Sequence, residues 1–122
     1  MQPISPRPIN AKEIAVLQAA LTRAHLAEVP IEIIQSVSRL TVIGRCDCGC
    51  DSVDFERKKS TGSIFYRLAD AISFSETGEE TGVMVWAESN EIASLEVYNF
   101  SDDIAHLPVP ESIRSFETAV KK

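Results

Sequence analysis

The sequence predicts an α+β fold, in which an N-terminal helix or helical hairpin packs on a mainly antiparallel meander sheet of about five strands. Two observations predict this fold. Up to about residue 38 the apolar residues recur at helical spacing, and beyond it they alternate with polar residues between glycine-containing turns. Helices that precede a run of strands, without alternating with them, indicate a sheet covered by helices on one face.

The first predicted helix begins after Asn10 and runs through "AKEIAVLQAALTRAHLAE". Asn10 is a favourable N-cap, and Glu13 is placed to complete a capping box. Ile9 and Ile14 are placed to form a hydrophobic staple across the same end. Apolar residues then recur on one stripe, which predicts a helix with one buried face: Ile14, Leu17, Leu21 and Ala24.

Pro30 is expected to end this helix, because the residue before a proline is pushed out of the helical region. The next segment, "PIEIIQSVS", predicts a short second helix with Pro30 at its first position. Ile33, Ile34 and Val37 are expected to face inward. A strand over the same residues stays open, since the segment is rich in β-branched side chains.

Residues 40–46 and 52–58 are predicted to form two strands of a hairpin. In the second strand Val53 and Phe55 fall on one face, and Asp54 and Glu56 fall on the other. The cysteine-containing segment between the strands is then the turn. We therefore expect residues 41–45 and 52–56 to be antiparallel neighbours.

The remaining strands are expected over residues 62–76, with a bulge around 69–71, and over residues 83–88 and 93–101. They complete the meander, and a short helix is expected over residues 111–116. Trp86, Tyr98 and Phe100 occupy alternating strand positions, which predicts core packing. The carboxylates of these strands are expected on a solvated face, with a catalytic acidic row as the alternative: Asp54, Glu56, Glu88 and Glu96.

Composition narrows the class of protein. The 122 residues suffice for one core, so a single domain over residues 1–122 is expected. A formal net charge of −6 predicts no nucleic-acid partner, and the basic cluster at 57–59 is expected to be a solvated hairpin tip. No apolar run approaches the roughly 20 residues of a membrane helix, so no membrane partner is expected. Prolines in "MQPISPRPIN" predict no export and hence a cytoplasmic location.

The segment "RCDCGCDSVDF" holds all three cysteines, Cys46, Cys48 and Cys50. Three thiolates nearly complete a four-coordinate zinc or iron site. Residues two apart in a straight strand are about 6.6 Å apart, too far for one ion, but Gly49 allows the chain to fold back. The missing ligand is expected from one of four residues or from water: Asp47, Asp51, His25 or His106.

Two other readings of the cysteines stay open. Cysteine is among the most frequently buried residues, so the three thiols are also compatible with simple packing in the core. Thiol redox chemistry is less favoured, because the spacing departs from C-x-x-C and no helix follows to lower a thiol pKa.

The chain also resembles a group of small uncharacterised bacterial proteins that share a C-x-C-G-C-x-S core. The segments that carry the resemblance are "EIAVLQAAL", "VIGRCDCGCDSVDF" and "SLEVYNFSDDIAHLPVPESI", and the likeness extends from about residue 10 to residue 114. The resemblance implies a bacterial cytoplasmic protein and assigns no catalytic residue. It also implies proline after the third cysteine, where this sequence has Asp51.

Two functions from different classes follow as hypotheses. The first is a small acidic protein-binding module that pairs with a basic protein, such as a toxin or a regulator, through its sheet face or acidic rim. The second is a zinc-binding protein with Cys46, Cys48 and Cys50 as ligands, in a structural or a catalytic site. Without a phosphate-cradling glycine loop, a serine nucleophile elbow or H-E-x-x-H, the sequence favours binding over catalysis.

Overall fold

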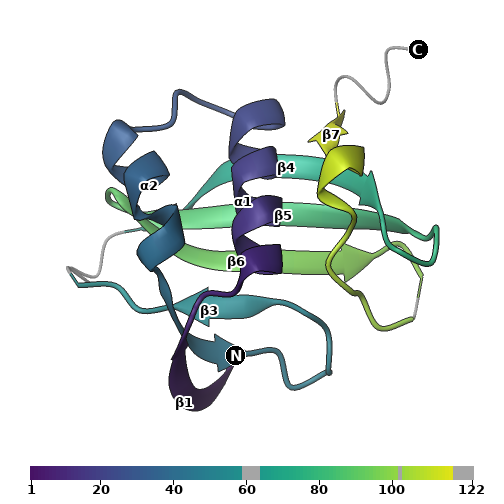
Figure 1. The fold of residues 1–122 in the computed structure, drawn as a ribbon, viewed down its shortest axis with the longest axis horizontal. Coiled ribbons are helices and arrows are strands. Elements are labelled where there is room, and N and C mark those ends of the chain that lie inside the picture. Colours follow the sequence, from purple (N-terminus) through teal and green to yellow (C-terminus); the bar gives the residue numbers. More distant parts are fainter. Residues whose placement is uncertain (59–63, 102, 117–122) are drawn as a thin grey trace.

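The computed structural model describes residues 1–58, 64–101 and 103–116, and within them one antiparallel sheet carries its helices on one face (Figure 1). The order of the seven strands is β1-β2-β3-β6-β5-β4-β7. Along the chain the elements are β1 (Gln2–Pro8), α1 (Ala11–Arg23), α2 (Ile31–Ser36), η1 (Val37–Arg39), β2 (Thr41–Arg45), β3 (Val53–Phe55), β4 (Tyr66–Phe74), β5 (Glu80–Glu88), β6 (Glu91–Asn99), η2 (Pro110–Ser112) and β7 (Arg114–Ser115).

The α+β class and the helix on an antiparallel sheet are confirmed, but the number of strands and the simple meander are wrong. Only β4, β5 and β6 form a meander, and β3 pairs with β6 instead of β4. The two additional strands, β1 and β7, lie at the edges. β1 contains Pro3, Pro6 and Pro8, which an edge strand tolerates because one side of its backbone needs no ladder partner.

The start of α1 has the predicted capping box. Asn10 Oδ1 accepts from the Glu13 amide at 2.8 Å, and Glu13 Oε1 accepts from the Asn10 amide at 3.0 Å. The Glu13 side chain is buried, and Arg7 of β1 donates to both of its oxygens, at 3.0 and 2.8 Å. This hydrogen bond and the carboxylate charge raise the pKa of Arg7. One carboxylate therefore ties the edge strand to the helix.

The second helix forms where it was expected, with Pro30 as its N-cap residue. Ile33 and Val37 are buried, as predicted. Ile34 was expected to face inward as well, but its side chain is 51% exposed. Helix α2 is only six residues long. With about 3.6 residues per turn, Ile33 and Val37 share the side that faces the core, and Ile34 lies at the edge of that side.

The predicted hairpin is confirmed: β2 and β3 are antiparallel, with Val42 opposite Phe55 and Arg45 opposite Val53. Arg57, the first residue of the basic cluster at 57–59, does not lie in a solvated hairpin tip as expected. Its Nε lies 2.9 Å from Glu88 Oε1. Its guanidinium also donates to the carbonyls of Phe55 and Ala93, at 3.0 and 3.2 Å. Lys59 lies outside the described residues.

The strand predicted over residues 62–76 is β4, which covers Tyr66–Phe74. Its register shifts between Arg67 and Ala69, slightly before the expected bulge. The start of the predicted strand, residues 62 and 63, lies outside the described part. The helix expected over residues 111–116 is wrong for most of its length. A single turn of 3₁₀ helix, η2, is followed by β7, which pairs with β4 through Ala71 and Ile72.

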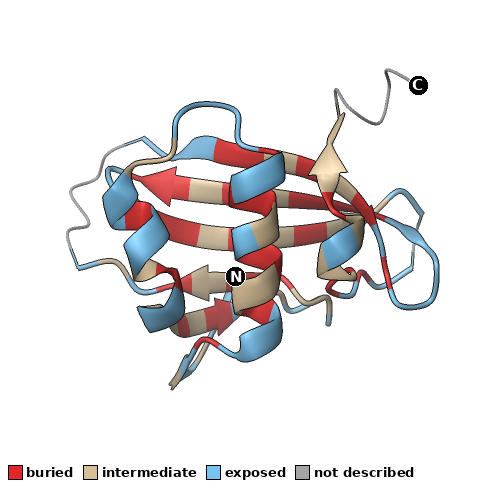
Figure 2. Ribbon diagram, turned by 45° about the horizontal axis from the view of Figure 1, so that its top comes forward, coloured by how far each residue is buried: buried red, intermediate tan, exposed pale blue. Residues whose placement is uncertain are grey.

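The core lies between the helices and one face of the sheet, and Figure 2 shows buried positions alternating with less buried ones along the strands beneath α1. Its side chains come from both layers, and the fully buried ones include Val16, Leu17, Ile33, Phe55, Val83, Val85 and Leu95. Three alanines of β4 and β5, Ala69, Ala71 and Ala87, belong to the same cluster. Small side chains on the sheet allow α1 to pack closely. None of the described helices is long and apolar enough to cross a membrane.

The capping network generates a stability prediction. We expect Glu13→Ala to lower the free energy of unfolding by about 2 kcal/mol, because it removes the cap acceptor and leaves Arg7 without its buried partner. Asn10→Ala is expected to cost about 1 kcal/mol. Lys12→Ala is the control, since its ion pair with Glu76 is exposed to solvent and contributes little to stability. Equal losses for Glu13→Ala and Lys12→Ala in urea unfolding would contradict this account.

Candidate metal centre

The cysteines lie in the loop that joins β2 to β3. Gly49 has a φ of 93°, a conformation that only glycine adopts without strain. Two backbone hydrogen bonds close the loop, from the Gly49 amide to the Cys46 carbonyl at 3.3 Å and from the Cys46 amide to the Ser52 carbonyl at 3.2 Å. The chain therefore reverses within five residues, as the position of Gly49 predicts, and the three side chains converge.

The sulfur atoms of Cys46, Cys48 and Cys50 all lie within 4.8 Å of one another. Two thiolates on one tetrahedral zinc, each at about 2.3 Å, lie about 3.8 Å apart. Cys46 Sγ and Cys48 Sγ are closer, at 2.7 Å, and share a hydrogen bond. Small rotations of the cysteine side chains would therefore bring the three sulfurs to the spacing of a three-thiolate zinc site. Among the described residues these cysteines form the one such group of possible ligands.

None of the three thiols is buried, so the interpretation that they pack in the core is wrong. Cys48 is exposed, and Cys46 and Cys50 are half-buried. Only Cys50 touches the edge of the core, and its Sγ donates to Ser52 Oγ at 3.3 Å. Three exposed or half-exposed thiols in one loop are open both to metal ions and to oxidants.

The shared hydrogen bond separates the acidities of two thiols. Donation to Cys48 raises the pKa of Cys46 to about 11, because losing that proton breaks the bond. The same donation stabilises the Cys48 thiolate and lowers the pKa of Cys48, helped by its contacts with Cys50, whose amide donates to Cys48 Sγ at 3.4 Å. Of these two thiols, Cys48 is the one whose thiolate the shared hydrogen bond favours.

Two of the possible fourth ligands, Asp51 and His106, lie at this loop. The Asp51 amide donates to the Ala105 carbonyl at 3.0 Å, and Asp51 Oδ2 accepts from the Leu107 amide at 2.6 Å. His106 stands between those two residues, and its Nδ1 lies 3.7 Å from Asp51 Oδ2. Sequence reasoning left these two residues as alternatives, because the contact between residues 51 and 105–107 depends on the tertiary fold.

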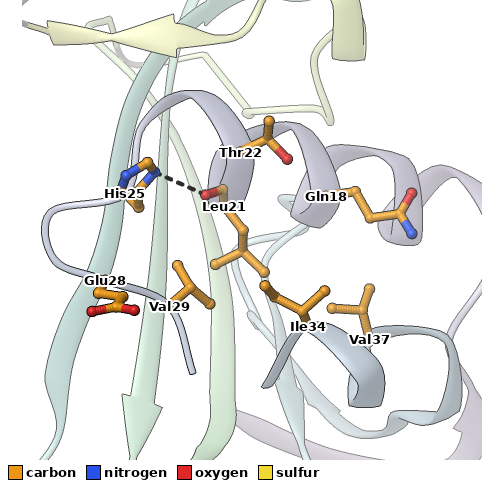
Figure 3. Close-up of a pocket in the computed structure, with 8 residues that line it drawn as sticks. All are labelled: Gln18, Leu21, Thr22, His25, Glu28, Val29, Ile34 and Val37. Atoms are coloured by element: carbon orange, nitrogen blue, oxygen red, sulfur yellow. Dashed lines mark hydrogen bonds between the residues drawn. The ribbon is translucent and has the colours of Figure 1, made fainter. Parts of the chain in front are cut away.

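The other two possible ligands differ in their positions. Asp47 is an exposed residue within the loop. His25 lies elsewhere, after the end of α1, where its Nδ1 donates to the Leu21 carbonyl at 3.1 Å and its backbone pairs with Ala69 of β4. Figure 3 shows His25 at one end of a groove of about 300 Å³, whose apolar wall is made by Leu21, Val29, Ile34 and Val37. His25 is therefore a groove residue with a satisfied hydrogen bond.

A cavity of about 560 Å³ borders the cysteine loop on the side of β1 and α1. Its wall contains both signs of charge, Arg7 and Arg45 together with Glu13 and Asp51, as well as Cys50. Arg7 is already engaged by Glu13. The mixed charges do not select one class of small ligand, and solvent reaches the loop through this cavity.

The second feature with binding chemistry is the sheet face opposite the helices, which we call the open face. It carries the alternate residues of β4, β5 and β6, including Ile72, Met84, Trp86, Glu96 and Tyr98, all half-buried. Their registers bring them together: Met84 is opposite Glu96, and Gly82 is opposite Tyr98. The Tyr98 ring covers Gly82 so closely that no side chain fits at that position.

The prediction that Trp86, Tyr98 and Phe100 are core residues is therefore wrong. Trp86 and Tyr98 lie on the open face, and Phe100 is 57% exposed, with its ring edge-to-face against Tyr98 at 5.6 Å. The signal that the sequence offers is three alanines at alternate positions, Ala69 and Ala71 in β4 and Ala87 in β5, since small residues let a helix pack closely on a sheet. The large residues between them then occupy the other face.

The carboxylates expected on one solvated face have different environments. Glu56 is exposed and Asp54 is half-buried, and burial raises the pKa of Asp54. Glu88 is buried against Arg57, which excludes it from a solvated row. Glu96 lies on the open face and accepts from Trp86 Nε1 at 3.1 Å. Arg57 Nη1 also lies 3.9 Å from Asp54 Oδ1, so Asp54 and Glu88 share one cation, which makes their role structural.

Comparisons with protein-family models, with curated proteins and with solved structures find no match to the chain. The resemblance to the triple-cysteine group stays a prediction. The candidate function therefore rests on the geometry of the cysteine loop and of the open face.

The loop geometry predicts an order of thiol reactivity. In reduced, chelator-treated protein we expect iodoacetamide to alkylate Cys48 first, because Cys48 is exposed and its pKa is lowered by donation from Cys46. Cys46 retains its proton and should react later. Peptide mapping by mass spectrometry at early times measures the order. Initial alkylation at Cys46 or Cys50 would contradict the assigned hydrogen bond.

Proposed function

We propose that the protein binds one zinc ion through the thiolates of Cys46, Cys48 and Cys50. The observation that supports this proposal is the convergence of three solvent-accessible sulfurs within 4.8 Å in one glycine-closed loop. Thiolates favour zinc over the hard cations calcium and magnesium, and zinc accepts the tetrahedral geometry that a compact loop can supply. Binding displaces the thiol protons into solvent, since the ligands are thiolates.

The three sulfurs do not need to occupy ideal tetrahedral positions before zinc binds. The loop ends are fixed by the Cys46–Ser52 backbone bond and by the two hydrogen bonds between Ser52 Oγ and the backbone of Val97. Between them only the side chains of Cys46, Cys48 and Cys50 need to rotate. A fixed frame with adjustable sulfurs lowers the ordering cost of binding, which otherwise opposes metal capture.

Elemental analysis tests the zinc proposal. Protein purified without chelator is expected to carry close to one zinc per chain, and Cys48→Ser is expected to abolish it, because the central ligand is lost. His25→Ala is the matched control, since His25 lies in the groove between α1 and α2 and should leave the zinc content unchanged. Metal-free wild-type protein that also takes up no added zinc would sink the proposal. The proposal would also fail if Cys46 and Cys48 formed a disulfide that persists under reducing conditions, which would lower the intact mass by two hydrogen atoms.

A second function is favoured by the open face: binding of a basic protein. Exposed or half-exposed aromatic residues such as Trp86, Tyr98 and Phe74 are the type that dominates protein–protein interfaces. Within the described residues Glu80 and Glu96 have no cationic partner there, and the chain carries a net charge of −6. Burial raises the pKa of Tyr98, and the charges of Asp70 and Glu96 add to this while the charge of Arg67 opposes it. Charge complementarity therefore favours a basic partner.

Affinity capture with paired variants tests this second function. The captured protein is expected to be basic, to dissociate as salt rises, and to lose at least about 2 kcal/mol of binding free energy with Trp86→Ala. Gln18→Ala, on the helical side, is the control and should bind as wild type does. An acidic partner, or binding that survives Trp86→Ala at high salt, would contradict the assignment of this face.

A further inference from the structure

We infer that His106 is the fourth ligand of the zinc site and that Asp51 orients it, so that the site is closed and joins the cysteine loop to the segment that follows β6. This inference rests on the proposed zinc function, and it goes further by deciding between a structural site and a catalytic one. A fourth protein ligand leaves no position for a reactive water.

The first observation is that the two segments are already joined. The Asp51 amide bonds to the Ala105 carbonyl, the Leu107 amide bonds to Asp51 Oδ2, and Ile104 Cδ1 lies 3.7 Å from where a side chain on Gly49 would begin. Residues 104–107 therefore run along residues 49–51. The backbone of His106 is held beside the cysteines by bonds that do not involve its own side chain.

The second observation concerns the orientation of His106. Its neighbours Ala105 and Leu107 are buried, whereas the His106 side chain is 63% exposed, so the imidazole lies outside the core on the side of the loop. Nδ1 lies 3.7 Å from Asp51 Oδ2, and within the described residues Nε2 has no hydrogen-bond partner. A carboxylate near Nδ1 favours the tautomer with its proton on that nitrogen, which leaves Nε2 available to a metal.

The net charge of the site favours His106 over the carboxylates as the fourth ligand. Zinc with three thiolates carries a single net negative charge, and a neutral imidazole adds none. Asp47 or Asp51 as the fourth ligand would add another negative charge in a chain whose net charge is already −6. Asp51 Oδ2 is also engaged by the Leu107 amide at 2.6 Å. An orienting role for Asp51 keeps that bond and uses the same oxygen, which lies 3.7 Å from His106 Nδ1.

Coordination requires the imidazole to rotate, since its nitrogens are not among the atoms that cluster within 4.8 Å. An exposed side chain changes rotamer on the picosecond to nanosecond scale and loses few contacts when it does so. The bond from the Asp51 amide to the Ala105 carbonyl and the bond from the Leu107 amide to Asp51 Oδ2 can stay in place during this rotation. The expected consequence is a loop and a following segment that become one rigid unit when zinc is present.

The test uses the full chain loaded with zinc and compares variants of its two histidines. We expect His106→Ala to weaken zinc binding by roughly tenfold or more in a chelator competition, and Asp51→Ala to weaken it by about 10–100-fold. His106→Cys should restore tight binding with a fourth thiolate. His25→Ala and Asp47→Asn are matched controls that should bind zinc as wild type does.

X-ray absorption at the zinc edge gives a readout that folding alone does not change. Wild type is expected to show three sulfurs at about 2.3 Å and one nitrogen at about 2.0–2.1 Å, and His106→Ala should lose the nitrogen signal. Zinc bound equally well by His106→Ala, with three sulfurs and an oxygen in wild type, overturns this inference while the proposed zinc function stands. Wild-type protein that binds no zinc overturns both.

Discussion

The arrangement of the cysteine loop depends on one buried hydroxyl. Ser52 Oγ accepts from the Val97 amide at 2.8 Å and donates to the Val97 carbonyl at 3.1 Å. The hydroxyl therefore pairs with Val97 of β6 as the backbone of a neighbouring strand would. Strand β3 has only three residues, and two of them pair with β6. The Ser52 bonds extend this short ladder to the base of the loop. Because residues 104–107 follow β6, the same contact helps to place them beside the loop, where the Asp51 amide donates to the Ala105 carbonyl.

Features that depend on neighbours in the sequence could be predicted. The capping box at Asn10 and Glu13 needs only residues within one helical turn, and the reversal at Gly49 needs only its own backbone. The hairpin of β2 and β3 follows from the same turn and from the alternation on both sides. For the site, the sequence predicted which residues meet at the turn. It could not predict their exposure, because that depends on what packs around the loop.

Features that depend on distant contacts were wrong or stayed open. Ser52 and Val97 are 45 positions apart, and no local pattern specifies that β3 pairs with β6 instead of β4. β1 contains three prolines, which argue against a central strand but not against an edge strand whose other side is free. Alternation along β5 predicts two faces without saying which one the helices cover. Trp86 was therefore placed in the core, although the small residue Ala87 beside it is the one that packs under the helices.

Asp51 shows how one position can link the local turn to the distant segment. A proline at position 51 would have no amide to donate to the Ala105 carbonyl. It would also lack the carboxylate that accepts from the Leu107 amide and lies beside His106. With aspartate, the chain holds residues 105–107 against the loop by three polar contacts from a single residue. Asp51 thus connects the local turn to a segment more than 50 positions away, and His106 of that segment lies with its Nδ1 3.7 Å from the Asp51 carboxylate.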